Sequence, residues 1–94
     1  MSDDFVARTV EIVNRAGMHA RPAAELVKLA GRFDSEIRLE KDGLEVNGKS
    51  IMGVLMLAAE QGSSLKISAR GEDAETAVSA ISELVARGFD EIES

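Results

Sequence analysis

The sequence lacks cysteine, tryptophan and tyrosine, and its 94 residues include only one histidine, one proline and three phenylalanines. Without cysteine there is no disulfide, no thiol nucleophile and no thiolate zinc site. Because a single imidazole leaves only carboxylates as further ligands, we expect neither a metal ion nor a cofactor. Basic residues are also few, 11 against 17 acidic ones, for a net charge of −6. The acidic balance and the scarcity of aromatic rings argue against a nucleic-acid-binding protein.

Long hydrophobic runs are absent as well. The longest, residues 51–59, contains a glycine and is far shorter than the roughly 20 residues that span a membrane. The acidic N-terminus does not resemble a signal peptide. With 45% apolar and 30% charged residues, the composition is that of a globular protein. We therefore expect one domain over residues 1–94, cytoplasmic, without membrane insertion, and nothing requires more than a monomer.

Four segments alternate apolar and polar residues with a period of two, as half-buried strands do. They are residues 6–13, 36–40, 44–47 and 65–70. Asp42-Gly43, between the second and third segments, is a strong hairpin signal. This alternation predicts an antiparallel sheet with one covered face and one face in water.

Three segments have helical spacing. The first is 20–33, the second begins after Ser50 and runs to about residue 59, and the third follows Asp73 and stops before Gly88. Ser50 and Asp73 are both favourable N-caps, and glycine commonly ends a helix. The order β-α-β-β-α-β-α predicts an α+β domain with its helices on one face of a four-stranded sheet.

His19 is the only imidazole, and its surroundings place it at the start of the first helix. Pro22 suits only a first helical turn, where its missing N–H is not needed. The free N–H groups at that helix end form an anion site, and Arg21 adds a positive charge. Residues 14–32 hold four basic side chains and one acidic one. A phosphate or an acidic partner would fit this basic region.

Two interpretations of His19 stay open at this point. A lone histidine in a small domain is most commonly an ordinary surface or capping residue. The chain has no second histidine, no thiol and no evident Ser-His-Asp arrangement, so a complete hydrolytic site is not apparent. A neutral imidazole can nevertheless accept a group on a ring nitrogen and return it. Such a residue would act as a relay.

Two motifs resemble the HPr family of phosphocarriers, from the phosphoenolpyruvate-dependent phosphotransferase system. Residues 17–23, Gly-Met-His-Ala-Arg-Pro-Ala, resemble the family's active-site signature. Residues 47–55, Asn-Gly-Lys-Ser-Ile-Met-Gly-Val-Leu, resemble its regulatory-serine segment. The resemblance covers nearly the whole chain and implies an open-faced β-sandwich. This agrees with the fold that the alternation predicts.

The resemblance also implies roles for individual residues. His19 would be phosphorylated on Nδ1 by enzyme I and dephosphorylated by enzyme IIA components. Arg21 would contact the phosphoryl group, and Pro22 would shape the helix start. The protein would be a transiently phosphorylated relay and not an enzyme that turns over alone. One position departs from the pattern: many members have Asn or Ser before the glycine, whereas this chain has Ala16, so the hydrogen bonding of this loop is in question.

Ser50 has two compatible interpretations. As an ordinary N-cap it would stabilise its helix by roughly 1 kcal/mol. The resemblance implies instead a regulatory phosphorylation site for HPr kinase/phosphorylase. A phosphate at a helix N-terminus would be tolerated, but it would place a charge of about −1.5 to −2 beside the surface that meets enzyme I.

The apolar run after Ser50 is expected to be partly exposed, because a short helix buries only one stripe. We expect Val54 and Leu57 in the core. Ile51, Met52 and Leu55 would then form a docking surface, with charges nearby from Lys28 and Lys49. The alternative is that the whole run is core. The last five residues, 90–94, are expected to fray.

Two alternative functions remain. The chain could belong to the nitrogen-related regulatory branch of the same system, which Asn14-Arg15 and residues 87–91 resemble, whereas residues 49–53 are closer to the sugar branch. It could also be an interaction module that acts through Ser50 and the apolar surface, with His19 incidental. Loss of binding on Ser50→Asp, with no effect of His19→Ala, would favour the module.

Overall fold

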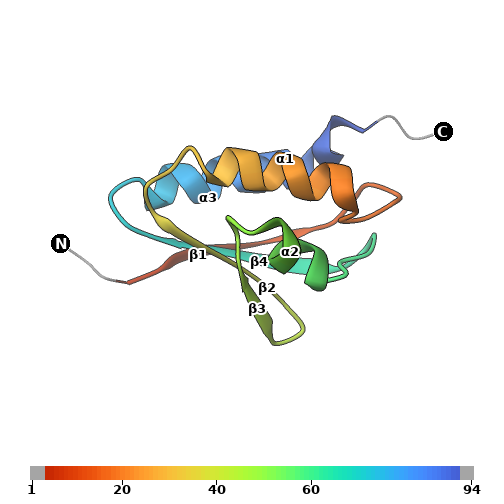
Figure 1. Cartoon of the computed structure of the whole chain (residues 1–94), viewed down its shortest axis with the longest axis horizontal. Helices are drawn as coiled ribbons and strands as arrows, with labels where there is room; N and C mark the ends of the chain where they lie inside the picture. The colour runs from red at the N-terminus through yellow and green to blue at the C-terminus, as the bar shows by residue number, and fades with distance from the viewer. Residues whose placement is uncertain (1–3, 92–94) are drawn as a thin grey trace.

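The computed structural model describes residues 4–91, and the predicted order of strands and helices is confirmed (Figure 1). The elements are β1 (Val6–Glu11), α1 (Ala20–Ala30), β2 (Glu36–Lys41), β3 (Leu44–Asn47), α2 (Ile51–Met56), β4 (Ser64–Arg70), α3 (Ala74–Ala86) and the 3-10 turn η1 (Gly88–Asp90). Between residues 4 and 91, no helix combines the length and apolar character needed to cross a membrane.

The four strands form one antiparallel sheet in the order β1-β4-β2-β3. The central strand β4 pairs on both sides, since Ala69 lies opposite Val6 of β1 and opposite Ile37 of β2. Helices α1 and α3 run side by side along the sheet, and α2 packs against α1 and β3 (Figure 1). The predicted class, an α+β fold with a four-stranded antiparallel sheet and three helices, is confirmed.

The core lies between the sheet and the helices. Alternate residues of β2 and β4 point into it, which confirms the period-two pattern. The helices contribute one stripe each. The buried side chains include Ile37 and Leu39 of β2, Leu65, Ile67 and Ala69 of β4, Ala23, Leu26 and Ala30 of α1, Val54 of α2, and Ala77, Val78, Ile81 and Val85 of α3.

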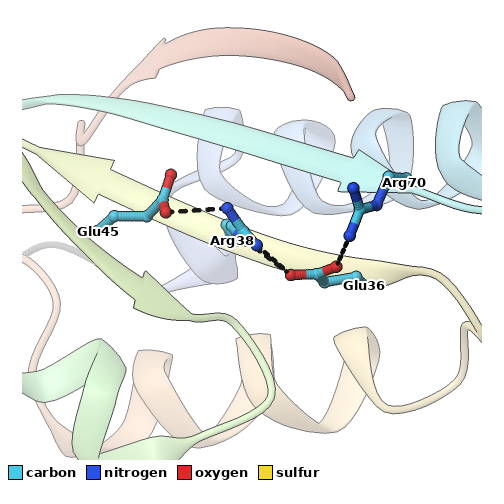
Figure 2. Close-up of polar contacts among 4 residues, drawn as sticks. All are labelled: Glu36, Arg38, Glu45 and Arg70. Atoms are coloured by element: carbon cyan, nitrogen blue, oxygen red, sulfur yellow. Dashed lines mark hydrogen bonds and ion pairs between the residues drawn. The ribbon is translucent and has the colours of Figure 1, made fainter. Parts of the chain in front are cut away.

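The other face of the sheet carries a chain of charges (Figure 2). Glu36 accepts from Arg38 Nε at 2.7 Å and from Arg70 Nη2 at 2.8 Å, while Arg38 Nη1 donates to Glu45 at 3.1 Å. The two guanidinium groups also lie 4.6 and 4.7 Å from the centre of the Phe5 ring. This face is therefore polar, as the alternation predicts, and its exposed ion pairs add little to stability.

Three elements end earlier than predicted. Helix α1 ends at Ala30 and not at residue 33. The N–H groups that follow donate to the carbonyl three residues back, as in the hydrogen bond from Phe33 N–H to the Ala30 carbonyl at 3.1 Å, and this does not continue an α-helix. Helix α2 ends at Met56, since Ala58 has a left-handed φ of 48° that no α-helix continues. Strand β1 ends at Glu11. In each case the periodicity continues into a turn that does not keep the regular backbone.

Asp73 occupies the predicted N-cap position of α3 but makes no side-chain cap bond there. Its carboxylate accepts hydrogen bonds from the backbone N–H groups of Asp34, at 2.9 Å, and Ser35, at 3.0 Å, and from the Ser35 hydroxyl. These bonds hold the connection between α1 and β2 against the start of α3. The Ser35 hydroxyl, and then the Asp34 amide, hold the pKa of Asp73 below its ordinary value.

We expect Asp73→Asn to lower the melting temperature at neutral pH and to weaken the acid sensitivity of the fold. Because the folded-state pKa lies below the unfolded value of about 3.9, the stabilisation is complete above that value and is lost as the pH falls through the folded pKa. Thermal unfolding from neutral to acid pH measures this. Asp42→Asn, in the exposed hairpin turn, is the matched control, and an identical acid response in both variants would contradict the prediction.

Candidate functional site

His19 is the N-cap residue of α1, as predicted. Its backbone is extended (φ −87°, ψ −170°), and its carbonyl accepts the first helical hydrogen bond from Ala23 N at 3.0 Å. The side chain makes no cap bond and is 42% exposed. Pro22 lies buried in the first turn. The imidazole therefore stands at the protein surface beside the N–H groups of a helix start, which have no acceptor within the helix.

The loop before His19 is held tightly in place. Gly17 has a left-handed φ of 70°, and its N–H donates to the Asn14 carbonyl at 3.1 Å. Met18 is buried, and its N–H donates to the Ala59 carbonyl at 2.8 Å. A Cβ at position 17 would lie 2.5 Å from the Ala59 oxygen, so only glycine fits. The loop is thereby joined to the segment that follows α2.

Asn14 holds the same loop through a buried side-chain hydrogen bond. Its side chain is buried, and Nδ2 donates to the Gly17 carbonyl at 2.8 Å and to Glu91 Oε1 at 2.9 Å. Both partners are acceptors, which fixes the orientation of the amide. Although Ala16 cannot form a side-chain hydrogen bond, Asn14 provides one to this loop. From the sequence, Asn14 was not predicted to be a site residue. The one local feature that could have indicated its role is its position as a polar residue directly after the predicted strand 6–13.

Glu91 completes the site from the other end of the chain. Its Oε2 lies 2.9 Å from Nε2 of His19. The prediction that residues 90–94 fray is wrong for Asp90, which lies in η1, and for Glu91; residues 92–94 lie outside the described part. Sequence reasoning missed Glu91 because no local pattern distinguishes it from the other acidic residues near the terminus.

The Glu91 carboxylate is held in its charged form. The hydrogen bond from Asn14, and then the one from His19, lower its pKa below the ordinary value, and burial only partly opposes them. Arg21 adds a weaker electrostatic contribution in the same direction. A carboxylate can only accept, so Nε2 of His19 carries the hydrogen in this arrangement. Within residues 4–91, no protein group is bonded to Nδ1.

In the described part of the chain, Arg21 forms neither a hydrogen bond nor an ion pair with His19. Its side chain is 78% exposed and lies beside Glu25, with Nε 3.8 Å from Oε1, one helical turn further on. Such an exposed pair is weak. The guanidinium is consequently available to swing toward an anion at the helix start.

Ser50 caps α2 as predicted. Its Oγ accepts from Gly53 N at 3.0 Å, and its carbonyl accepts from Val54 N at 3.0 Å. The hydroxyl is half-buried at the first turn of the helix. Ser50 therefore has the structural role of an N-cap.

The apolar run of α2 divides between core and surface. Val54 and Leu57 are buried, and Ile51 and Met52 are exposed, 45% and 70% respectively, as predicted. Leu55 was predicted to be exposed, but it is half-buried and packs against the core, because the helix places it between the two faces. The alternative that the whole run is core is wrong. Met56, which was not among the predicted surface residues, is 64% exposed. Its spacing of four from Met52 places both side chains on the same face of the helix and could have indicated this.

The two predicted lysines differ in their surroundings. Lys28 is exposed in the last turn of α1. Lys49 bends toward the C-terminal end of α1, where its Nζ donates to the Phe33 carbonyl at 2.7 Å. Lys49 therefore links the start of α2 to the end of α1.

The comparisons with known proteins agree with one another. The sequence profile of a family described as "PTS HPr component phosphorylation site" matches residues 6–87. The chain is 51% identical over 87 residues to Phosphocarrier protein HPr of Treponema pallidum, covering 93% of this chain and 99% of that protein. It is 42% identical to Phosphocarrier protein NPr of Escherichia coli K12, with 92% and 97% covered. A crystal structure of HPr-C-His from Thermoanaerobacter tengcongensis is similar with a TM-score of 0.89 at 45% identity, covering 94% and 99% of the two chains.

Proposed function

The chain belongs to the HPr family of phosphocarrier proteins of the phosphotransferase system, and we propose that it carries the phosphoryl group on Nδ1 of His19. The donor would be phospho-enzyme I, and the acceptors would be enzyme IIA components in the cytoplasm. The observation that carries this proposal is the position of His19 at the α1 N-cap, where Nε2 lies 2.9 Å from the Glu91 carboxylate and no group within residues 4–91 is hydrogen-bonded to Nδ1. This leaves a nucleophilic nitrogen beside an anion-binding helix end.

The transfer itself needs no nucleophile of this chain other than His19. The Nδ1 lone pair forms the new bond to phosphorus, while the bond between phosphorus and the donor breaks and its electron pair leaves with the donor. The N–H groups of the first turn of α1 face the incoming negative charge. Arg21, exposed and only weakly paired, would turn to contact the phosphoryl oxygens. The partner protein would exclude water from the site.

The partner surface would be the exposed apolar side of α2. Ile51, Met52 and Met56 project from it, with Leu55 contributing its exposed part. The Met18–Ala59 hydrogen bond joins the segment after α2 to the His19 loop, so one partner would reach both regions. Methionine side chains adapt to differently shaped partners, which suits a carrier that must meet both a donor and several acceptors.

Phosphorylation of Ser50 by HPr kinase/phosphorylase would regulate this docking. We expect Ser50→Asp to slow transfer from enzyme I by roughly tenfold or more, because it places a charge beside Ile51 and Met52. Aspartate is itself a good N-cap, so α2 should keep its stability. Ser50→Ala is the matched control. It should lose about 1 kcal/mol of stability but transfer normally. Normal transfer in Ser50→Asp would contradict the regulatory role.

The direct test is phosphorylation with phosphoenolpyruvate, Mg²⁺ and enzyme I. We expect the intact mass to increase by one phosphoryl group, in an acid-labile form. Because the chain has one imidazole, ³¹P NMR and the ring nitrogen resonances can assign the adduct to Nδ1 directly. No adduct with enzyme I of either branch would overturn the proposal and favour an interaction module acting through Ser50 and α2.

A nitrogen-related role is the second candidate, and the 42% identity to Phosphocarrier protein NPr over most of the chain favours it. The two branches use different enzymes I. Transfer rates measured with both donors at equal concentrations would separate the candidates. We expect faster transfer from the sugar-branch enzyme, because the Lys49 to Gly53 segment is closer to that branch.

A further inference from the structure

We propose that Glu91 is a positioning residue for His19, which holds the reactive tautomer and stabilises the ring after phosphorylation. This inference rests on the proposed phosphocarrier function and assigns a role to a residue outside both motifs. It starts from two hydrogen bonds to the Glu91 carboxylate. Asn14 Nδ2 lies 2.9 Å from Oε1, and His19 Nε2 lies 2.9 Å from Oε2. Each carboxylate oxygen has its own donor, so the group has one preferred orientation.

The backbone before Glu91 is shaped to bring it to the site. After α3 ends, Gly88, Phe89 and Asp90 have successive left-handed φ values of 67°, 59° and 57°. For the bulky Phe89 this conformation is strained, and such strain persists only where the surroundings determine it. The Phe89 ring is buried, and the Glu91 N–H donates to the Gly88 carbonyl at 3.1 Å. The turn thus directs the Glu91 side chain back toward the start of α1.

The carboxylate then decides which ring nitrogen reacts. An ionised carboxylate accepts hydrogen bonds and cannot donate one, so Nε2 must keep its hydrogen. In the neutral ring the lone pair therefore lies on Nδ1, the nitrogen to which no group within residues 4–91 is hydrogen-bonded. Asn14 maintains this state, because its hydrogen bond favours the charged form of Glu91. The arrangement acts through His19 and does not contact the phosphoryl group.

The same contact changes the energy of the phosphorylated state. When the Nδ1 lone pair bonds to phosphorus, the Nε2 proton stays in place and the ring becomes positively charged. Glu91 then faces a cation in place of a neutral ring, which favours the phosphorylated form. A nearby opposite charge commonly shifts such an equilibrium by about tenfold, the equivalent of one pKa unit. Glu91 would therefore adjust how readily His19 gives up its phosphoryl group.

Glu91→Gln tests this inference because it keeps the shape of the side chain, removes its charge and replaces one acceptor oxygen by an N–H donor. Glu83→Gln, on the exposed side of α3, is the matched control with the same charge change. In ¹⁵N-labelled protein in mildly alkaline solution, we expect the Nε2–H tautomer alone in the wild type and the control. In Glu91→Gln an Nδ1–H fraction should be present. The equilibrium constant for transfer from phospho-enzyme I should fall by about tenfold in Glu91→Gln only.

An unchanged tautomer ratio, or an unchanged equilibrium constant, would overturn the role of Glu91 even if the melting temperature fell. The tautomer is measured on unphosphorylated protein, so that result does not depend on any donor. If the wild type accepted no phosphoryl group at all, the proposed function would fail separately.

Discussion

His19→Ala is expected to abolish phosphoryl acceptance completely while leaving the fold intact. The imidazole is the only nucleophile at the start of α1, and no other side chain there can form the same bond. Its side chain makes no cap bond and is 42% exposed, so its removal should cost only the hydrogen bond to Glu91, about 1 kcal/mol of the free energy of unfolding. Intact mass after incubation with enzyme I and phosphoenolpyruvate measures the first effect, and urea unfolding measures the second.

His19→Asn provides the matched control for helix stability. Asparagine is a favourable N-cap but not a nucleophile, so this variant should be as inactive as His19→Ala and at least as stable. An adduct of normal yield in either variant would place the acceptor elsewhere. Ser50 would then be the first residue to examine, because a phosphoserine adduct survives acid whereas a phosphohistidine adduct does not.

Gly17→Ala is expected to destabilise the protein by about 2–4 kcal/mol, the largest loss we predict for a change of one methyl group. Part of this loss comes from the left-handed φ of 70°. The larger part comes from a Cβ placed 2.5 Å from the Ala59 carbonyl oxygen and 3.0 Å from the Glu60 Cα, both backbone atoms. To relieve this clash the loop must move and strain the bond from Met18 N–H to Ala59. His19 would be displaced as a result, so transfer should slow as well.

Gly43→Ala separates the two contributions. Gly43 also has a left-handed φ, 85°, but a Cβ there would meet nothing within 4 Å. This variant should therefore lose only about 1 kcal/mol and transfer the phosphoryl group normally. Urea unfolding of the two variants measures the difference. Equal losses would show that the contact with Ala59 contributes nothing.

Local patterns predicted most of the fold correctly. The strands, the Asp42-Gly43 hairpin and the capping role of Ser50 depend on residues a few positions apart, where periodicity and turn chemistry act directly. The position of His19 is local too, because Pro22 fixes the first turn of α1. The same reasoning was less accurate where a helix ends. No residue type in the sequence predicts the left-handed backbone at Ala58, because alanine rarely adopts this conformation.

Some side chains have partners that the sequence could not indicate. Asp73 has the residue type of an N-cap, but its carboxylate binds Asp34 and Ser35, about 38 positions away. Leu55 is half-buried where a surface position was predicted, because the orientation of α2 against α1 and β3 sets which stripe is covered.

Short-range periodicity and capping were enough to predict the order of strands and helices, the class of fold, and the presence of one histidine at a helix start. How that histidine is held depends instead on tertiary packing. Glu91 reaches His19 across 72 positions and Asn14 across 77. Contacts of this range form only when β1, α1 and the end of α3 pack around a common core, and no local pattern encodes that arrangement.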